Sequence, residues 1–291
     1  MTSPTPPIVD AHAHVFLAAA MPQQGVHARW RGDASAKRLL AAMHTADVGH
    51  ALLVPVGKDP AYVRSLRGRH AARFSALGVQ DGVGLSGDWV GDGVRLRWLG
   101  DDPTERFEAL PLAPLLRRLA ALEVPVSFYG DRHQLVLLET ALRALPDLTV
   151  MINHLGAPLE RLDADEHGRP TLDVDLPLPT LPVLERCAEY PNVAVAFSGL
   201  YAISRTDHPH MDLRPHVGRV LELFGPRRVL WGSDFPWIAD VPGYAATLEL
   251  VDVHLSELDP AERAAVLGGN AVQLFGIGPV PVASSRQEEL S

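Results

Sequence analysis

The chain has little of what marks several common protein classes. Its 291 residues include one cysteine, Cys187, so an internal disulfide is excluded. Lysine and arginine total 26 against 35 aspartates and glutamates, which gives a formal net charge of −9 at pH 7. No basic run is present that could follow a phosphate backbone, and a nucleic-acid partner is therefore not expected.

Long apolar runs are also missing, because Arg, Glu or Pro interrupts each of them well before the length of a membrane-spanning helix. The first seven residues lack the basic start and apolar centre of a secretion signal. We therefore expect a soluble protein of the cytoplasm that acts on a small molecule, with no membrane partner. The sequence is compatible with a homo-oligomer but does not specify one.

No glycine-rich phosphate loop follows the first apolar run, which argues against an open, doubly wound sheet. Eight short apolar runs, most of them followed by a helical pattern, instead predict βα units around a parallel sheet. The predicted strands are Ile8–Val15, His50–Val56, Phe74–Gln80, Val94–Leu99, Val124–Tyr129, Leu148–His154, Asn192–Ser198 and Arg228–Ser233. The predicted helices are Ala34–Ala46, Ala61–Ala72, Leu112–Leu122, Arg132–Ala144, Leu181–Glu189, Arg214–Leu223, Tyr244–Leu255 and Pro260–Phe275.

This alternation predicts an α/β fold, a (β/α)8 TIM barrel over residues 8–277. The crossover Asp81–Gly93 is rich in glycine and contains no convincing helix, so the third crossover is expected to be degenerate. Asp259 before Pro260 predicts a helix start, with a capping carboxylate ahead of a proline. Residues 1–7 are expected to form a flexible N-terminus, and residues 278–291 a weakly ordered C-terminal tail.

Two histidines, His12 and His14, end the first predicted strand. Residues i and i+2 of a strand face the same way, so both imidazoles project from one face. His154 ends the sixth predicted strand and Asp234 follows the eighth, and barrel enzymes build their sites at these ends. We predict that the four side chains meet there. They suit one divalent metal, zinc or manganese, or metal-free stabilisation of an oxyanion by the histidines.

Five further residues are predicted to contact the substrate. Arg95 and Arg97 share a face of the fourth predicted strand, where a guanidinium can bind a carboxylate in bidentate fashion. The alternative is that one or both pair with acidic residues near the barrel wall. Tyr129, Ser198 and Trp237 lie at other strand ends and are expected to line the site, with simple packing as the alternative.

Six segments carry a family resemblance and span nearly the whole chain in order. They are Val9–His14, Gly93–Leu96, Asn153–Pro158, Asn192–Leu200, Phe224–Trp237 and Gly269–Gly276. On these segments the chain resembles the amidohydrolase-related TIM-barrel hydrolases. Within that family it is most similar to the lactonase-like branch, which includes 2-pyrone-4,6-dicarboxylate lactonase and the sugar-lactone hydrolases.

The resemblance implies that water opens a lactone or similar carboxylic ester. Asp234 would act as general base, His154 would polarise the carbonyl, and His12 and His14 would bind a metal or stabilise the oxyanion. An aspartate with an ordinary pKa of about 4 is a weak base, so a metal or a hydrogen-bond network must assist it.

Several departures from the family pattern narrow this expectation. No lysine lies on the fourth strand, where binuclear relatives carry a metal-bridging lysine, so at most a mononuclear site is expected. Asn153 and Ala196 stand where the branch usually has Asp and Lys, which suggests a different substrate. Metal-dependent nonoxidative decarboxylation of an aromatic or enol carboxylic acid is the alternative reaction. A binding or scaffold protein without chemistry is the non-enzymatic alternative.

Overall fold

The computed structural model describes residues 7–17, 30, 34–57 and 60–280. Twelve strands and ten α-helices are assigned within these residues. Of the two terminal segments predicted above, residues 1–6 and 281–291 lie outside the described part. No described helix has the length and apolar character to span a bilayer.

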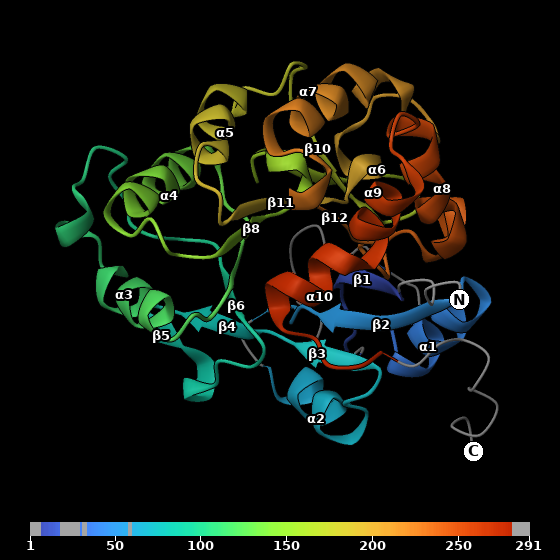
Figure 1. Cartoon of the computed structure of the whole chain (residues 1–291), viewed down its shortest axis with the longest axis horizontal. Coiled ribbons are helices and arrows are strands. Elements are labelled where there is room, and N and C mark those ends of the chain that lie inside the picture. Colours follow the sequence, from blue (N-terminus) through green and yellow to red (C-terminus); the bar gives the residue numbers. More distant parts are fainter. Residues whose placement is uncertain (1–6, 18–29, 31–33, 58–59, 281–291) are drawn as a thin grey trace.

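The described strands form a parallel barrel with helices outside it (Figure 1). Neighbouring strands pair in sequence order around the barrel. They are β1 (Ile8–Ala13), β2 (Val48–Leu53), β3 (Phe74–Ala76) with β4 (Gly78–Asp81), β6 (Val94–Leu96), β7 (Val126–Phe128), β8 (Val150–Ile152), β11 (Val193–Phe197) and β12 (Val229–Trp231). The predicted (β/α)8 barrel is therefore confirmed.

Strands β3 and β4 occupy a single barrel position, interrupted at Leu77. The Leu77 N–H donates to the Leu53 carbonyl at 3.0 Å on the β2 side. The Gly78 N–H donates to the Gly93 carbonyl at 2.9 Å on the β6 side. The strand therefore changes partners within one residue, which joins the two halves of the sheet.

The barrel closes where the chain just beyond β12 meets β1. The Asp234 N–H donates to the His12 carbonyl at 2.9 Å, and the His14 N–H donates to the Phe235 carbonyl at 2.6 Å. Ala13 and Phe235 form an isolated parallel bridge at the same place. This closure, which we call the seam, joins residues more than 200 positions apart.

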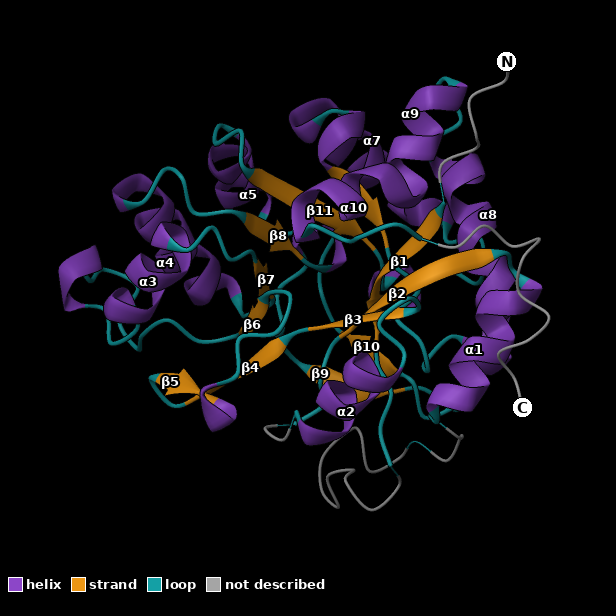
Figure 2. Cartoon of the chain, turned by 60° about the horizontal axis from the view of Figure 1, so that its bottom comes forward, coloured by secondary structure: helices purple, strands orange, loops and turns teal. Residues whose placement is uncertain are grey.

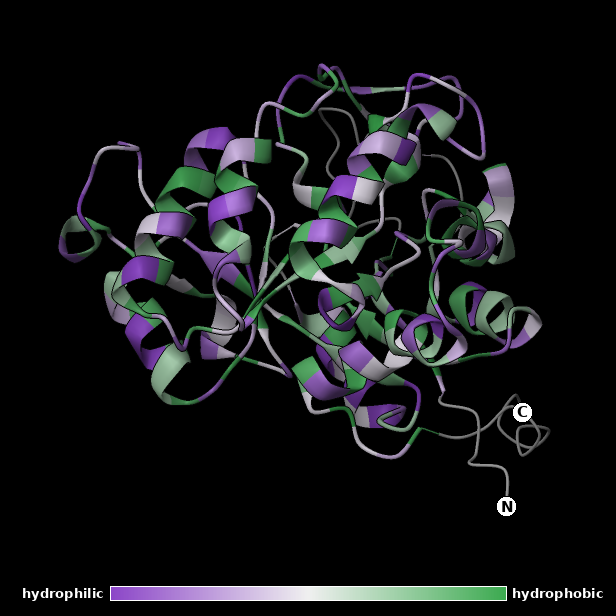
Figure 3. Ribbon diagram, turned by 45° about the horizontal axis from the view of Figure 1, so that its top comes forward, coloured by the Kyte–Doolittle hydropathy of each residue, from purple (hydrophilic) through white to green (hydrophobic). Residues whose placement is uncertain are grey.

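Helices cover the outside of the barrel, and Figure 2 shows them around the strands. They are α1 (Ala36–Thr45), α2 (Ala61–Arg69), α3 (Ala113–Ala121), α4 (Arg132–Ala144), α5 (Leu181–Ala188), α6 (Leu200–Ile203), α7 (Arg214–Phe224), α8 (Tyr244–His254), α9 (Pro260–Ala264) and α10 (Asn270–Phe275). In Figure 3 their ribbons mix hydrophilic and hydrophobic segments, as expected of helices with one face on the core.

Alternate residues of each strand supply two apolar cores. On β11, Val193 and Val195 pack outward against the helices, while Ala194 and Ala196 belong to a smaller interior cluster. Phe275 of α10 joins that interior cluster. Helix α10 thus helps to cover the amino-terminal end of the barrel, opposite to the end where His12 and His14 emerge.

The predicted helix Pro260–Phe275 is interrupted. It consists of α9, a π-helical turn at Ala265–Gly269, and α10. A Cβ on Gly268 would lie 2.0 Å from the Pro7 carbonyl oxygen, so this turn packs directly on the start of β1. Asp259 caps α9 in a reciprocal capping box with Glu262, which confirms the predicted start.

The third crossover is degenerate, as predicted. Between β4 and β6 the chain forms only the short strand β5 (Gly84–Leu85), antiparallel to β4, and a 3-10 turn, η3 (Ser86–Asp88). Gly82, Gly84 and Gly87 have the spacing GxGxxG. No α-helix starts there, so this segment lacks the helix N-terminus that a phosphate-binding loop requires.

Candidate active site

His12 and His14 project together from the carboxyl end of β1. Their Nε2 atoms lie 3.2 Å apart, and the rings meet edge to face with centroids 4.8 Å apart. The His14 Nδ1 lies 2.8 Å from the Val54 carbonyl oxygen, which can only accept a hydrogen bond. His14 therefore donates through Nδ1, and its Nε2 atom faces His12 and Asp234.

Asp234 lies just beyond β12 in the left-handed region, with φ of 61°. Its Oδ1 is 3.4 Å from the Nε2 of His14 and 3.6 Å from that of His12. Its Oδ2 accepts a hydrogen bond from the Tyr201 hydroxyl at 2.8 Å. Burial alone would raise the pKa of Asp234, but the adjacent histidines hold this pKa below its usual range. The carboxylate is therefore ionised, and each of its oxygens has a polar neighbour.

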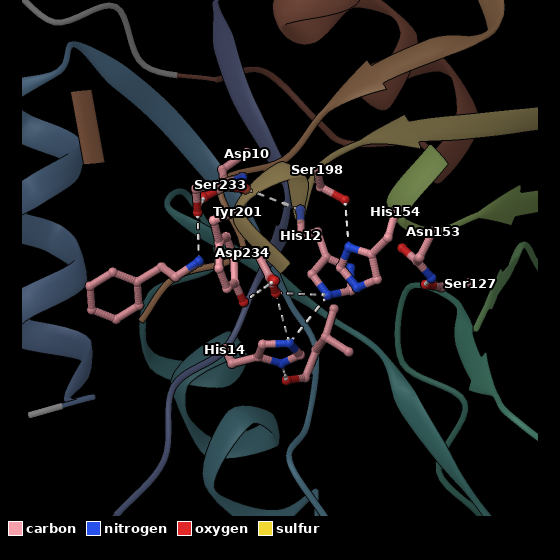
Figure 4. A network of polar contacts seen from close by, with 12 residues as sticks. Asp10, His12, His14, Ser127, Asn153, His154, Ser198, Tyr201, Ser233 and Asp234 are labelled. Atoms are coloured by element: carbon pink, nitrogen blue, oxygen red, sulfur yellow. Dashed lines mark hydrogen bonds and ion pairs between the residues drawn. The ribbon is translucent and has the colours of Figure 1, made fainter. Parts of the chain in front are cut away.

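The donor atoms of His12, His14 and Asp234 lie within 4.8 Å of one another and are all buried (Figure 4). Two imidazole nitrogens and one carboxylate oxygen are a donor set that zinc binds, with positions left for water or substrate. The Nε2 atom of His14 faces this group. The three residues therefore fit a single divalent metal, in agreement with the expected mononuclear site.

His154 stands beside this set. Its ring centroid lies 4.9 Å from that of His12, and its Nδ1 is 3.0 Å from the Ser198 Oγ. A Cβ on Gly199 would approach the same Nδ1 to 2.5 Å, so only glycine fits there. Burial lowers the pKa of His154 to about 4, which makes the ring neutral at pH 7. The predicted ligand set included His154, but the structure groups only the other three residues.

Ser198 does not line the substrate cavity described below. It is 2% exposed, lies behind His154 and contacts that ring instead of the open space. The expectation that Ser198 contacts substrate is therefore corrected to a positioning role. The next residue, Gly199, does line the cavity, so the chain reaches it just after Ser198.

Asp10 and Tyr201 are buried residues of this region that were not among the predicted site residues. The Oδ1 of Asp10 accepts from the backbone N–H groups of His12 at 3.1 Å and Ser233 at 2.9 Å. Its Oδ2 accepts from the Ser233 hydroxyl at 2.5 Å and the Tyr244 hydroxyl at 2.8 Å. Burial raises the pKa of Asp10 to about 6 despite these four donors. Asp10 thus ties β1 to the turn that carries Asp234.

A cavity of about 190 Å³ opens above these residues. Four of the five residues predicted to contact substrate line it, namely Arg95, Arg97, Tyr129 and Trp237. The remaining described lining consists of His14, Pro55, Val56, Gly57, Val79, His154, Leu159, Leu162, Pro170, Leu172, Gly199, Tyr201, Ala202 and Asp234. His12 is fully buried beneath the cavity, so His14, His154 and Asp234 form its reactive surface.

Arg95 is the buried cation of the cavity. It is 8% exposed, its guanidinium lies 5.8 Å from the Tyr129 ring centroid, and its Nη1 has no hydrogen-bond partner in the described structure. Burial, with the nearby Arg97, lowers the pKa of Arg95 to about 10, so it remains charged at pH 7. An unsatisfied, buried guanidinium is suited to an anionic ligand. No described carboxylate forms an ion pair with Arg95. The alternative, in which Arg95 pairs with an acidic residue near the barrel wall, is therefore not observed among the described residues.

Comparisons with known proteins agree with this site. A family model described as amidohydrolase matches residues 9–277. The chain belongs to this amidohydrolase family, and the predicted family and hydrolase class are confirmed at that level.

Three relatives illustrate the match. The L-fucono-1,5-lactonase of Burkholderia ambifaria is 26% identical over 92% of this chain and 95% of its own length. An amidohydrolase of Burkholderia multivorans, solved with bound zinc, has a TM-score of 0.73 at 21% identity and covers 94% of this chain and 100% of its own. A protein of Pseudomonas putida assigned as a 2-pyrone-4,6-dicarboxylic acid hydrolase has a TM-score of 0.71 at 21% identity, over 94% and 98%. The two structures show that the fold is shared.

Proposed function

We propose that the protein opens a lactone by hydrolysis, with Asp234 accepting the proton of the attacking water. The observation that carries this proposal is the convergence of Asp234, His14, His154 and the unpartnered Arg95 on one cavity at the carboxyl end of the barrel. Two relatives support it, since one is named as a lactonase and the other as a hydrolase of a pyrone, which is a cyclic ester. The substrate that we propose carries a carboxylate, which Arg95 and Arg97 hold.

In this proposal the water oxygen bonds to the lactone carbonyl carbon while one water proton passes to Asp234. The bond between the acyl carbon and the ring oxygen then breaks, and the proton goes to that oxygen, which yields a hydroxy acid. The neutral His154, held through Nδ1 by Ser198, directs its Nε2 to the carbonyl oxygen. Tyr201 keeps the carboxylate of Asp234 oriented.

His12, His14 and Asp234 would hold one divalent metal, and zinc matches this donor set best. When bound, the metal would supply Lewis acidity and lower the pKa of water. This assistance matters because the pKa of Asp234 is held low, which makes the free carboxylate a weak base.

The test is a panel of neutral and carboxylated lactones with purified protein, whose bound metal is measured by elemental analysis. Asp234→Asn is expected to lower kcat by about 10²- to 10⁴-fold, the range for loss of a general base. Asp252→Asn, a surface residue paired with Arg263, serves as the matched control. Full activity in Asp234→Asn would eliminate the proposed base.

Two other outcomes would replace the proposal. Carbon dioxide release from an aromatic or enol carboxylic acid, with strict metal dependence and no lactone turnover, would establish the decarboxylase alternative. The buried Arg95 favours an acid substrate in either reaction, so both substrate classes belong in the panel. Ligand binding without any turnover, unchanged in variants of the site, would indicate a scaffold.

A further inference from the structure

A hairpin that was not predicted presents an apolar face to the cavity. It consists of β9 (Leu162–Ala164) and β10 (Pro170–Leu172), which are antiparallel (Figure 2). Leu162 pairs with Leu172, and side chains two apart on a strand share a face, so Pro170 lies on the same side. All three residues line the cavity, and we call them the hairpin wall. The neighbouring Asp163 is not among the lining residues, in agreement with the alternation of a strand.

Arg169 fixes this hairpin to the reactive end of the barrel. Its Nε donates to the Asp165 carboxylate at 2.6 Å across the hairpin turn. Its Nη1 donates to the Val241 carbonyl at 2.7 Å, in the segment that follows Asp234. Its guanidinium also lies 5.3 Å from the ring centroid of Tyr201, which holds Asp234. Arg169 thus links the hairpin to Tyr201 and to the segment that follows Asp234.

The lining beyond the wall has an apolar part and a polar part. Val56, Val79, Leu159 and Trp237 form the apolar part, and the polar side chains are those of His14, Arg95, Arg97, Tyr129, His154, Tyr201 and Asp234. Among the described lining residues there is no Ser, Thr, Asn, Gln, Lys or Glu side chain. A hydroxyl group placed against the hairpin wall and the other apolar side chains would therefore be buried without a partner from them, which weakens binding. An alkyl or aryl group would instead lose contact with water at no such cost.

We propose that the hairpin wall selects substrates with an apolar alkyl or aryl substituent, and that a carboxylate of the same molecule binds at Arg95 and Arg97. The preferred lactone is therefore amphiphilic, in contrast to a polyhydroxylated sugar lactone. This inference rests on the proposed function for the reaction, but it concerns binding and can be measured without turnover.

The binding test uses simple carboxylates as probes and isothermal calorimetry as the measurement. Affinity is expected to rise from butanoate to hexanoate and octanoate by about fourfold per methylene until the cavity is filled. Hexanoate is expected to bind more than tenfold more tightly than gluconate, which has six carbons and five hydroxyl groups. Equal binding of hexanoate and gluconate, or no dependence on chain length, would overturn the inference.

Two variants distinguish an effect of the hairpin wall from the effect of replacing any exposed leucine. Leu162→Asn replaces a wall residue that is 37% exposed, so the substitution is tolerated by the fold. It is expected to reduce the gain from butanoate to octanoate by at least threefold. Leu122→Asn, at a site 58% exposed at the end of α3, makes the same chemical change away from the cavity and should leave that gain unchanged. An equal effect of both variants would show that the hairpin wall does not select the apolar substituent.

Hydrolysis of matched δ-lactones keeps this inference distinct from the proposed function. The substrates are δ-valerolactone, its 5-butyl derivative and glucono-1,5-lactone, compared by kcat/KM. Preference for the butyl derivative supports the wall, and preference for the sugar lactone contradicts it. If alkanoates bind as expected but neither these lactones nor the carboxylated lactones of the panel are opened, the proposed reaction is wrong while the binding preference stands.

Discussion

The four polar residues at the base of the cavity and the hairpin wall at its side are built in different ways. The base, which we call the polar floor, comprises His12, His14, His154 and Asp234, none of which is more than 7% exposed. The wall comes from a connection between β8 and α5, and Leu162 remains 37% exposed. The strand ends of the barrel therefore place the reactive groups, while a loop element decides what reaches them.

This division assigns separate kinetic roles to the two regions. Three floor side chains are held by a contact outside the floor, namely His14 by Val54, His154 by Ser198 and Asp234 by Tyr201. Arg169 links the hairpin wall to Val241 and Tyr201. Changes to the floor should therefore lower kcat or metal affinity, whereas changes to the wall should mainly alter KM and substrate choice.

The largest effect is expected from His14→Ala, which removes a ligand nitrogen from the floor. Bound metal should fall from about one per chain to a small fraction, and kcat/KM should fall by at least about 100-fold, since even indirect metal contacts are worth 10- to 100-fold. Elemental analysis and lactone kinetics measure the two quantities. The exposed His133 provides the control His133→Ala. Unchanged metal content in His14→Ala would show that His14 does not bind the metal.

Asp10→Ala should cause the largest loss of stability. It leaves the buried donors of Ser233, Tyr244 and His12 without an acceptor, which should lower the free energy of unfolding by about 3–5 kcal/mol. Urea denaturation gives this value. The control Asp252→Ala breaks an exposed ion pair worth about 0–1 kcal/mol. A similar small loss for Asp10→Ala would show that the seam does not depend on this carboxylate.

Tyr201→Phe should affect the rate more than binding. The substitution keeps the ring against Arg169 and removes the hydrogen bond to Asp234, a bond to a charged group worth about 1.5–3 kcal/mol. We expect kcat to fall about tenfold or more with KM nearly unchanged, measured by steady-state kinetics. Tyr62→Phe is the matched control on α2. A rise in KM at constant kcat would mean that Tyr201 acts on substrate binding, like the hairpin wall, and not on the reaction step.

The smallest effect is expected from Arg169→Ala, which frees the hairpin from Val241 and Tyr201. KM for an alkyl-substituted lactone should rise about threefold because the wall becomes less ordered before binding, while kcat should change little. Arg263→Ala removes a surface arginine as the control. A large fall in kcat without a change in KM would mean that Arg169 positions the residues of the polar floor instead of the hairpin wall.

The polar floor could be predicted because the positions of its residues follow from the strands alone. His12 and His14 are two apart on β1, so they must share a face, and Asp234 follows β12 at the same end of the barrel. The barrel itself followed from the alternation of apolar runs with helical patterns.

Other features depend on contacts between distant segments. Asp10 gains its role only because Ser233 and Tyr244 meet it across the seam. Ser198 contacts His154 instead of the cavity, a choice of neighbour that a strand pattern does not indicate. The hairpin wall lies in the connection between β8 and α5, and its two strands are only three residues long, which is too short for an apolar pattern to predict them. The π-helical turn likewise requires the packing of Gly268 on Pro7.

The seam also determines when the site can form. His12 belongs to the first strand and Asp234 follows the last, so they meet only after the intervening chain has folded. Contacts of such large sequence separation are entropically costly and form late. During synthesis, the nascent chain would therefore present His12 and His14 long before their carboxylate partner exists. Competence for metal binding and turnover should coincide with closure of the barrel, which makes activity a direct report on complete folding.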